Sequence, residues 1–304
     1  MSISHYIKEI GRGKDGARSL TRVQSADLFG QVLDGTVTDF EVGAFCLAMR
    51  IKGETPQEMA GFLDATQARL IKIPTQGRTA VVLPSYNGAR KLPVLTPLLA
   101  LLLAREGLPV VVHGQATETP RISSQQVFAA LSIPTQEVIE VIATGSVQFV
   151  PTALLCPGLQ RLLDVRRLVG LRNSAHSLVK LMNPCDSPAV VVSSYTHPEY
   201  AVSMTDTFRL MQATALLLRG TEGEPVADPR RTPAMDAFID GEVTRVQEPQ
   251  SGSLVSVPGL PGADASSTAA WIQAVLAGQE PVPTPIARQV AHIVHLSVQT
   301  RKTT

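Results

Sequence analysis

The sequence lacks the long apolar run that a membrane-spanning helix requires. Of its 304 residues 44% are apolar, but the longest apolar stretch is opened by Pro97 and closed by Arg105, which is short of the ~18 residues that indicate a transmembrane helix. The N-terminal residues also lack the apolar core of a signal peptide. We therefore expect a globular, cytoplasmic protein.

Cysteine is scarce as well. Cys46, Cys156 and Cys185 are far apart in the chain, and no CxxC pair occurs. An odd number of widely spaced thiols is typical neither of a disulfide framework nor of a zinc site. We expect three buried, reduced cysteines.

Charged residues make up only 17% of the chain and nearly cancel, with a net charge of +1. Their distribution is nevertheless uneven, because residues 65–121 carry a net charge of +5 and residues 156–185 carry +4. The rest of the chain is therefore acidic. Such segregation favours an anionic partner, although an ordinary solvated surface is the alternative.

The N-terminal part of the sequence predicts helices. Thr38 and Glu41 have the spacing of a capping box, and Gly53 is placed to end the helix. Thr55 and Glu58 form a second box, with Pro56 at the first helical position.

From residue 79 the pattern changes to alternating strands and helices. Strands are expected near 79–83, 109–114, 147–150, 189–194 and 214–220. Helices are expected over 96–106 with Thr96 as cap, and over 123–131, 198–213, 267–278 and 284–299. The region 157–182 is expected to hold two helices and their joint.

This order predicts an α/β protein with a small helical domain and a larger α/β domain around a mostly parallel sheet. Residues 1–72 plus 157–186 form the helical domain, and residues 73–156 plus 187–304 form the α/β domain. We expect the helical domain to pack on the α/β domain with a cleft between them.

Three segments carry a family resemblance, namely AFCLAMRIKGETPQEMAGF, GLPVVVHG and LDVRRLVGLRN followed by MNP. They resemble the anthranilate phosphoribosyltransferases and the nucleoside phosphorylases of the same fold. The similarity runs over nearly the whole chain and implies their fold.

The resemblance also implies a glycine-rich loop for the pyrophosphate of phosphoribosyl pyrophosphate, but the matching place here reads PSYNGA, residues 84–89. Glycines are needed there because backbone N–H groups must approach the phosphates closely. Only Gly88 remains, and Tyr86 would fill space that a phosphate needs. The motif positions that we identify are Asn87, Gly88, Thr96, His113 and Gly114.

Other motif positions have changed together with this loop. Thr96 retains only a helix cap, and the segment around His113 has lost the lysine that contacts phosphate in the family. Residues 221–225 lack the adjacent carboxylate pair that carries magnesium. These departures argue against phosphoribosyl transfer, the reaction of the enzymes that the sequence resembles. We therefore assign no catalytic residue, no metal ligand and no cofactor.

The remaining pattern resembles a divergent branch of the family whose members bind nucleic acid without marked sequence preference and dimerise through the helical domain. Arg166 occupies the place of the family arginine that contacts the aromatic substrate. We predict that cations contact the phosphates of single- or double-stranded nucleic acid, so that binding depends strongly on salt. The predicted contacts are Lys52, Arg90, Lys91, Arg121, Arg166, Arg167, Arg172 and Lys180.

Six of these cations also have a simpler interpretation. Lys52, Arg172 and Lys180 come near helix ends, where cations suit the helix dipole. Arg90, Lys91 and Arg121 could be ordinary loop charges. Stacking residues are few, since aromatic residues make up 4% of the chain; Tyr86, Tyr195 and Tyr200 are the candidates.

Two other functions stay open. One is a glycosyltransferase, either a phosphoribosyltransferase or a phosphorylase, with an altered anionic substrate and Mg²⁺ as cofactor. The other is an interaction protein in which the charge is incidental.

Overall fold

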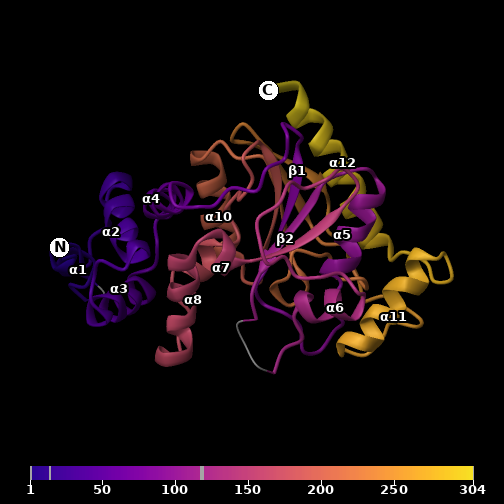
Figure 1. Cartoon of the computed structure of the whole chain (residues 1–304), viewed down its shortest axis with the longest axis horizontal. Helices are drawn as coiled ribbons and strands as arrows, with labels where there is room; N and C mark the ends of the chain where they lie inside the picture. Colours follow the sequence, from indigo (N-terminus) through magenta and orange to yellow (C-terminus); the bar gives the residue numbers. More distant parts are fainter. Residues whose placement is uncertain (1, 14, 117–119, 304) are drawn as a thin grey trace.

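The computed structural model describes residues 2–13, 15–116 and 120–303, and Figure 1 shows a helical part beside a larger part built on a sheet. The four N-terminal helices lie at the left of this view. Helices α8 and α9 come from the middle of the chain but contact α2 and α4, respectively. The bounds of these six helices are α1 (Ser4–Ile10), α2 (Arg22–Asp34), α3 (Asp39–Lys52), α4 (Pro56–Gln67), α8 (Pro157–Val169) and α9 (Ala175–Leu178).

The sequence places the starts of these helices through local hydrogen bonds. Thr38 and Glu41 form a reciprocal capping box at α3, and Thr55 and Glu58 form one at α4. Both boxes were predicted, because a capping box depends on residues three apart in sequence.

The sheet has seven strands in the order β3-β2-β1-β4-β5-β6-β7. Neighbouring strands from β3 to β5 are parallel, whereas β6 and β7 are antiparallel. Asp240 and Gly241, both with positive φ, join β6 to β7 in the left-handed turn that short hairpins favour. The bounds are β1 (Ala80–Ser85), β2 (Val110–Gly114), β3 (Val147–Pro151), β4 (Ala189–Tyr195), β5 (Ala215–Arg219), β6 (Met235–Ile239) and β7 (Glu242–Gln247).

Alternate side chains of each central strand belong to different cores. In β1, Val81 and Leu83 pack with α5, α6, α11 and α12, whereas Ala80 and Val82 share a core with α10 and the N-terminal helices. The core of the helical part is therefore continuous with one face of the sheet. The remaining helices are α5 (Thr96–Arg105), α6 (Ser124–Ala130), α7 (Thr152–Leu155), α10 (Pro198–Leu210), η1 (Thr221–Gly223), α11 (Ala265–Leu276) and α12 (Thr284–Thr303).

The structure confirms the α/β fold with a helical part and a mostly parallel sheet. The boundaries of the two domains stay a prediction. All three cysteines are buried and free, as expected, and within the described ranges no helix is both long and apolar enough to cross a membrane.

Residues 157–182 hold two helices, as expected, because α8 ends at Gly170 in the left-handed conformation and α9 is a separate short helix. One expectation about helices was wrong. Thr96 does not cap α5, since Leu95 occupies the cap position and the Thr96 hydroxyl bonds to Glu224 instead. The Thr96 hydroxyl thus bonds to a residue distant in the sequence and not to the backbone of its own helix.

Candidate functional site

The strand order reverses between β1 and β4, since the chain places β2 and β3 on one side of β1 and β4 and β5 on the other. In open α/β sheets ligands bind at such a point, outside the carboxyl ends of the strands. Here the loop after β1, residues 86–92, and the segment after β5, residues 220–225, meet at that edge. The hydrogen bonds between the two segments define the site.

A buried carboxylate fills the crevice at this edge. Glu224 is 1% exposed, and its Oε1 accepts the backbone N–H groups of Asn87 at 2.9 Å and Gly88 at 2.8 Å. Its Oε2 accepts the hydroxyls of Ser85 at 2.5 Å and Thr96 at 3.0 Å. We call these four donors the anion cradle.

Glycine is required at the centre of the cradle. Gly88 has a φ of +61°, and a Cβ there would lie 2.5 Å from the carbonyl oxygen of Ile122. The glycine that the sequence retained in this loop therefore allows the backbone N–H of residue 88 to face the carboxylate.

A second carboxylate lies beside the first. Glu222 accepts the backbone N–H groups of Arg90, Lys91 and Leu92, with its Oε1 2.8 Å from the nitrogen of Lys91. Its own backbone has φ 51° and ψ 21°, which costs a non-glycine residue roughly 1–2 kcal/mol. The surrounding hydrogen bonds hold Glu222 in this strained conformation.

Tyr86 fills the interior beneath the loop. It is 3% exposed, and its hydroxyl lies 2.8 Å from His113 Nδ1 and 2.9 Å from Thr152 Oγ1. Burial raises the pKa of Tyr86 and lowers the pKa of His113 to about 3. His113 is therefore a neutral structural histidine, and Tyr86 is not available for stacking on a base.

The residues after β5 do not fit a Mg²⁺ ion. The oxygens of Glu222 and Glu224 face N–H and O–H donors, whereas magnesium needs several oxygen ligands in near-octahedral geometry. In the described ranges no group of three or more His, Cys, Asp or Glu side chains comes together as a potential metal site.

An open cleft of about 540 Å³ lies next to the filled crevice, between the helical part and the sheet. Its wall combines the end of α3, the α9 region and the start of α10. Three cations line the cleft, namely Arg50, Arg172 and Lys180, together with the carboxylates of Glu54 and Glu199.

Lys180 connects the open cleft to the filled crevice. Its Nζ donates to the carbonyl oxygens of Gly223 at 2.9 Å and Ser194 at 3.2 Å. Burial lowers the pKa of Lys180 to about 8, although the negative charge of Glu224 opposes that shift. This predicted cation therefore has a role in holding residue 223 in addition to any contact with a ligand.

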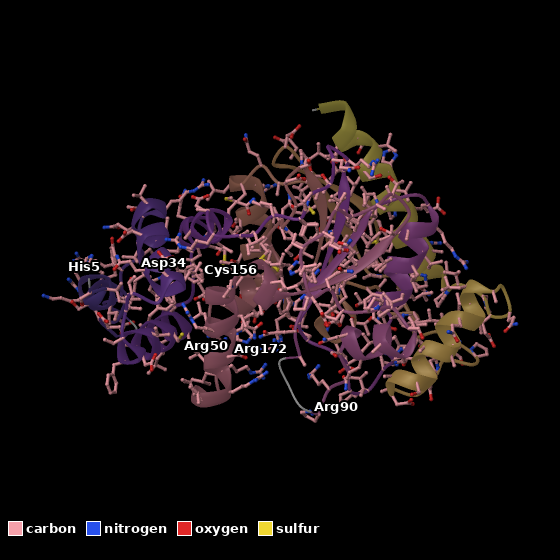
Figure 2. The ribbon with its side chains drawn as sticks, in the orientation of Figure 1. His5, Asp34, Arg50, Arg90, Cys156 and Arg172 are labelled. Atoms are coloured by element: carbon pink, nitrogen blue, oxygen red, sulfur yellow. The ribbon has the colours of Figure 1, made fainter. Side chains whose placement is uncertain are left out.

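Arg90 and Lys91 lie on the exposed side of the loop. Glu222 binds their backbone N–H groups, so the side chains of both residues are left to point outward. Both are exposed, and neither side chain has a hydrogen-bond or ion-pair partner in the part of the chain that the structure describes. In Figure 2 Arg50 and Arg172 lie side by side in the lower half of the view, between the helical part and the sheet, and Arg90 lies below them and to the right.

The predicted cations of α8 and of the loop after β2 approach the same edge. Arg167 donates to the carbonyl oxygen of Ala116 at 3.4 Å and lies 3.5 Å from Asp164. Arg121 donates to the carbonyl oxygen of Gly88 and lies 3.5 Å from a carboxylate oxygen of Glu222. Arg166 is half-buried in the last turn of α8.

Lys52 differs from the other predicted cations. Its Nζ lies 2.7 Å from Glu58 Oε2, and the side chains of Lys52 and Glu58 are 8% and 0% exposed. A buried ion pair accounts for this lysine, so we leave it out of the proposed contact surface. Arg50, on the same helix, was missed, although it is exposed and lines the cleft.

The helical part and the mostly parallel sheet together form the anthranilate phosphoribosyltransferase fold. The family model for the helical bundle domain of a glycosyl transferase family matches residues 4–69. The anthranilate phosphoribosyltransferase structure from Thermus thermophilus covers 98% of this chain and 89% of its own, with a TM-score of 0.74 at 19% identity. The structure of the Saccharomyces cerevisiae enzyme in complex with PRPP and Mg has a TM-score of 0.70 at 12% identity and covers 98% of this chain and 88% of its own.

Relatives found by sequence are more similar to this chain than these two structures are. The Escherichia coli (strain K12) protein YbiB, described as uncharacterized, is 42% identical over 302 residues, which are 96% of this chain and 93% of YbiB. The anthranilate phosphoribosyltransferase of Leifsonia xyli is 29% identical over 82% of this chain and 73% of its own. The chain therefore belongs to the anthranilate phosphoribosyltransferase-like family, together with YbiB.

Proposed function

We propose that the protein binds nucleic acid without sequence preference and that its scaffold no longer carries out phosphoribosyl transfer. The observation that carries this proposal is the pair Arg90 and Lys91, whose backbone is bound by Glu222 while their side chains extend into solvent. Cations held in this way can follow a phosphate backbone without reading bases.

The cleft and the edge of the sheet extend this surface. Arg50 and Arg172 line the cleft, and in Figure 2 Arg90 lies below them and to the right, on the same lower half of the view. A polyanion that runs along this edge would meet Arg90 and Lys91 first and then the mouth of the cleft. Because Glu54 and Glu199 also line the cleft, we expect most of the affinity to come from the exposed loop.

The crevice that Glu224 fills supports a function other than phosphoribosyl transfer. A sugar pyrophosphate and the carboxylate of Glu224 cannot occupy the same four donors at once, and Tyr86 fills the space below. The alternative of a transferase with another anionic substrate would have to use the open cleft alone. The observation that favours this alternative is the three cations that line the cleft, because they could bind an anionic substrate.

We further propose a homodimer that forms through α3 in the helical part. Phe40, Leu47 and Ile51 follow one another at helical spacing and are 93%, 46% and 62% exposed. Apolar side chains in one stripe on a helix are typical of an interface. A two-fold pair would place two basic edges on one particle and lengthen the surface for a polyanion.

The test is a titration of labelled single- and double-stranded oligonucleotides at several salt concentrations. Arg90→Ala/Lys91→Ala should lower the affinity by roughly tenfold at ~0.1 M salt and reduce the slope of log affinity against log salt by about 2, since two phosphate contacts are lost. Oligonucleotides of different sequence should be affected alike.

A matched control removes two exposed cations elsewhere. Arg78 precedes β1, at the opposite end of that strand from the loop, and Arg288 lies on α12; both are exposed. Arg78→Ala/Arg288→Ala changes the net charge equally and should leave the affinity within about twofold. Equal losses in the two double variants would contradict the proposed surface, and magnesium-dependent binding of phosphoribosyl pyrophosphate by the unmodified protein would favour the transferase.

A further inference from the structure

The donors around Glu224 have the chemistry of a phosphate site. Two backbone N–H groups from one loop and two hydroxyls converge on the carboxylate oxygens, at distances from 2.5 to 3.0 Å. Successive N–H groups in a turn form concavities that bind anions. The same donors would serve any compact oxyanion that reached them.

A third hydroxyl and a nearby cation complete the surroundings. Ser124 Oγ lies 2.7 Å from Ser85 Oγ and 3.5 Å from Glu224 Oε2. Lys180 is close enough for the charge of Glu224 to oppose the lowering of its pKa. The carboxylate is thus a buried negative charge surrounded by donors.

The segment that carries Glu224 is held in place by bonds of its own. Lys180 and Ser194 donate to the carbonyl oxygen of Gly223, and Asn87 donates to the carbonyl oxygen of Glu222. Gly223 has a φ of +90°, and a Cβ there would lie 1.8 Å from Asn87 Nδ2. These bonds hold the backbone beside Glu224 without using its side chain, and Ala89, next to the cradle, is paired with Ile122 through its backbone. We therefore expect the cradle to stay in place when the carboxylate is removed.

We propose that the anion cradle is a phosphate site occupied by the protein's own Glu224, and that Glu224 is the residue that excludes free phosphate and pyrophosphate from it. An intramolecular carboxylate competes at a high effective concentration, so an external anion cannot displace it. Without the carboxylate, the donors are buried and unsatisfied, which costs free energy until an anion binds. This inference does not depend on nucleic-acid binding, since it concerns a site inside the crevice and a different ligand.

The experiment compares the unmodified protein with Glu224→Ala, using inorganic pyrophosphate as the probe. Calorimetry should give an affinity for pyrophosphate that is at least about tenfold higher for the variant than the upper limit set by the unmodified protein, in which no binding heat is expected. In thermal unfolding, Glu224→Ala should melt at a lower temperature in potassium chloride and recover most of the loss in pyrophosphate of equal ionic strength, because a ligand of the folded state stabilises it.

Glu224→Gln is the matched control. Its amide keeps the volume and one oxygen acceptor for the N–H groups, so the cradle stays filled and pyrophosphate should neither bind nor raise the melting temperature. Adding Ser85→Ala to Glu224→Ala should weaken the new binding, because one hydroxyl donor is lost.

Three results would overturn the proposal. They are equal binding of pyrophosphate by the unmodified protein and Glu224→Ala, a folded Glu224→Ala that ignores pyrophosphate, and a Glu224→Ala that stays unfolded even in saturating pyrophosphate. The last result counts because a cradle that needs only an anion should be restored by one.

Discussion

Lys180 shows how a single residue can connect the pH of the solution to the cleft. Its pKa is lowered from 10.5 to about 8, chiefly because burial removes water from the ammonium. Between these two values the unfolded chain binds a proton at this position that the folded protein lacks. The folded protein therefore gains stability as pH rises through that interval, while the cleft loses a positive charge.

We predict that nucleic-acid affinity falls by about two- to threefold between pH 7 and pH 9 as Lys180 loses its proton. The Lys180→Arg variant keeps its charge over this range and should show a flatter profile. Fluorescence anisotropy at constant ionic strength measures both. Parallel profiles for the two proteins would mean that Lys180 does not contact the ligand.

Ion pairs elsewhere show why the net charge of a sequence window overstates the positive charge that a ligand meets at the surface. Arg69 binds Asp34 at 2.6 Å, and Arg121 and Arg167 each lie 3.5 Å from a carboxylate oxygen. These partners come partly from distant segments, so the net charge of a sequence window includes charges that the fold neutralises. Arg90 and Lys91 differ, because among the described residues a glutamate binds their backbone and no acid binds their side chains.

At the scale of elements, the junction of α3 and α4 is held by a buried ion pair. Glu58 accepts from the backbone N–H groups of Leu20 and Thr55 as well as from Lys52. Thus one carboxylate connects the capping box of α4, the end of α3 and the segment before α2. Lys52 belongs to this structural junction.

We predict that Lys52→Ala lowers the free energy of unfolding by about 3 kcal/mol, because it leaves a buried carboxylate without its charge partner. Urea unfolding followed by circular dichroism measures the loss. Nucleic-acid affinity at a temperature where the variant is folded should stay within about twofold. A variant of unchanged stability with weakened binding would restore Lys52 to the contact surface.

At the scale of the whole molecule, the exposed stripe on α3 makes the assembly testable. Phe40→Glu places a charge within the proposed two-fold contact and should yield monomers, since a buried unpaired charge opposes association. Val255→Glu, on the loop after β7, is the control because Val255 is 52% exposed and lies far along the chain from α3. Sedimentation velocity distinguishes the two forms, and a monomeric unmodified protein would refute the dimer.

The order of elements was predictable at this scale because local patterns decide it. Capping boxes such as that of Thr38 and Glu41, and the short apolar strands, depend on neighbours within a few residues. The resemblance of three segments to a known family then indicated how the elements pack. Two helices were expected in the region 157–182 as well, and Gly170, which ends α8, is a local signal of the same kind.

The sequence by itself determined the fold class, the family and the loss of the glycine-rich loop. Only the tertiary structure decided what replaced the ligand of that loop, because Glu224 lies more than a hundred residues away from Asn87 and Gly88, whose N–H groups it accepts. The same holds for Thr96. The local pattern predicted that Thr96 caps a helix, but its hydroxyl donates to the distant carboxylate of Glu224. Hydrogen bonds between distant segments leave no spacing in the sequence, so the occupied cradle became visible only in the folded chain.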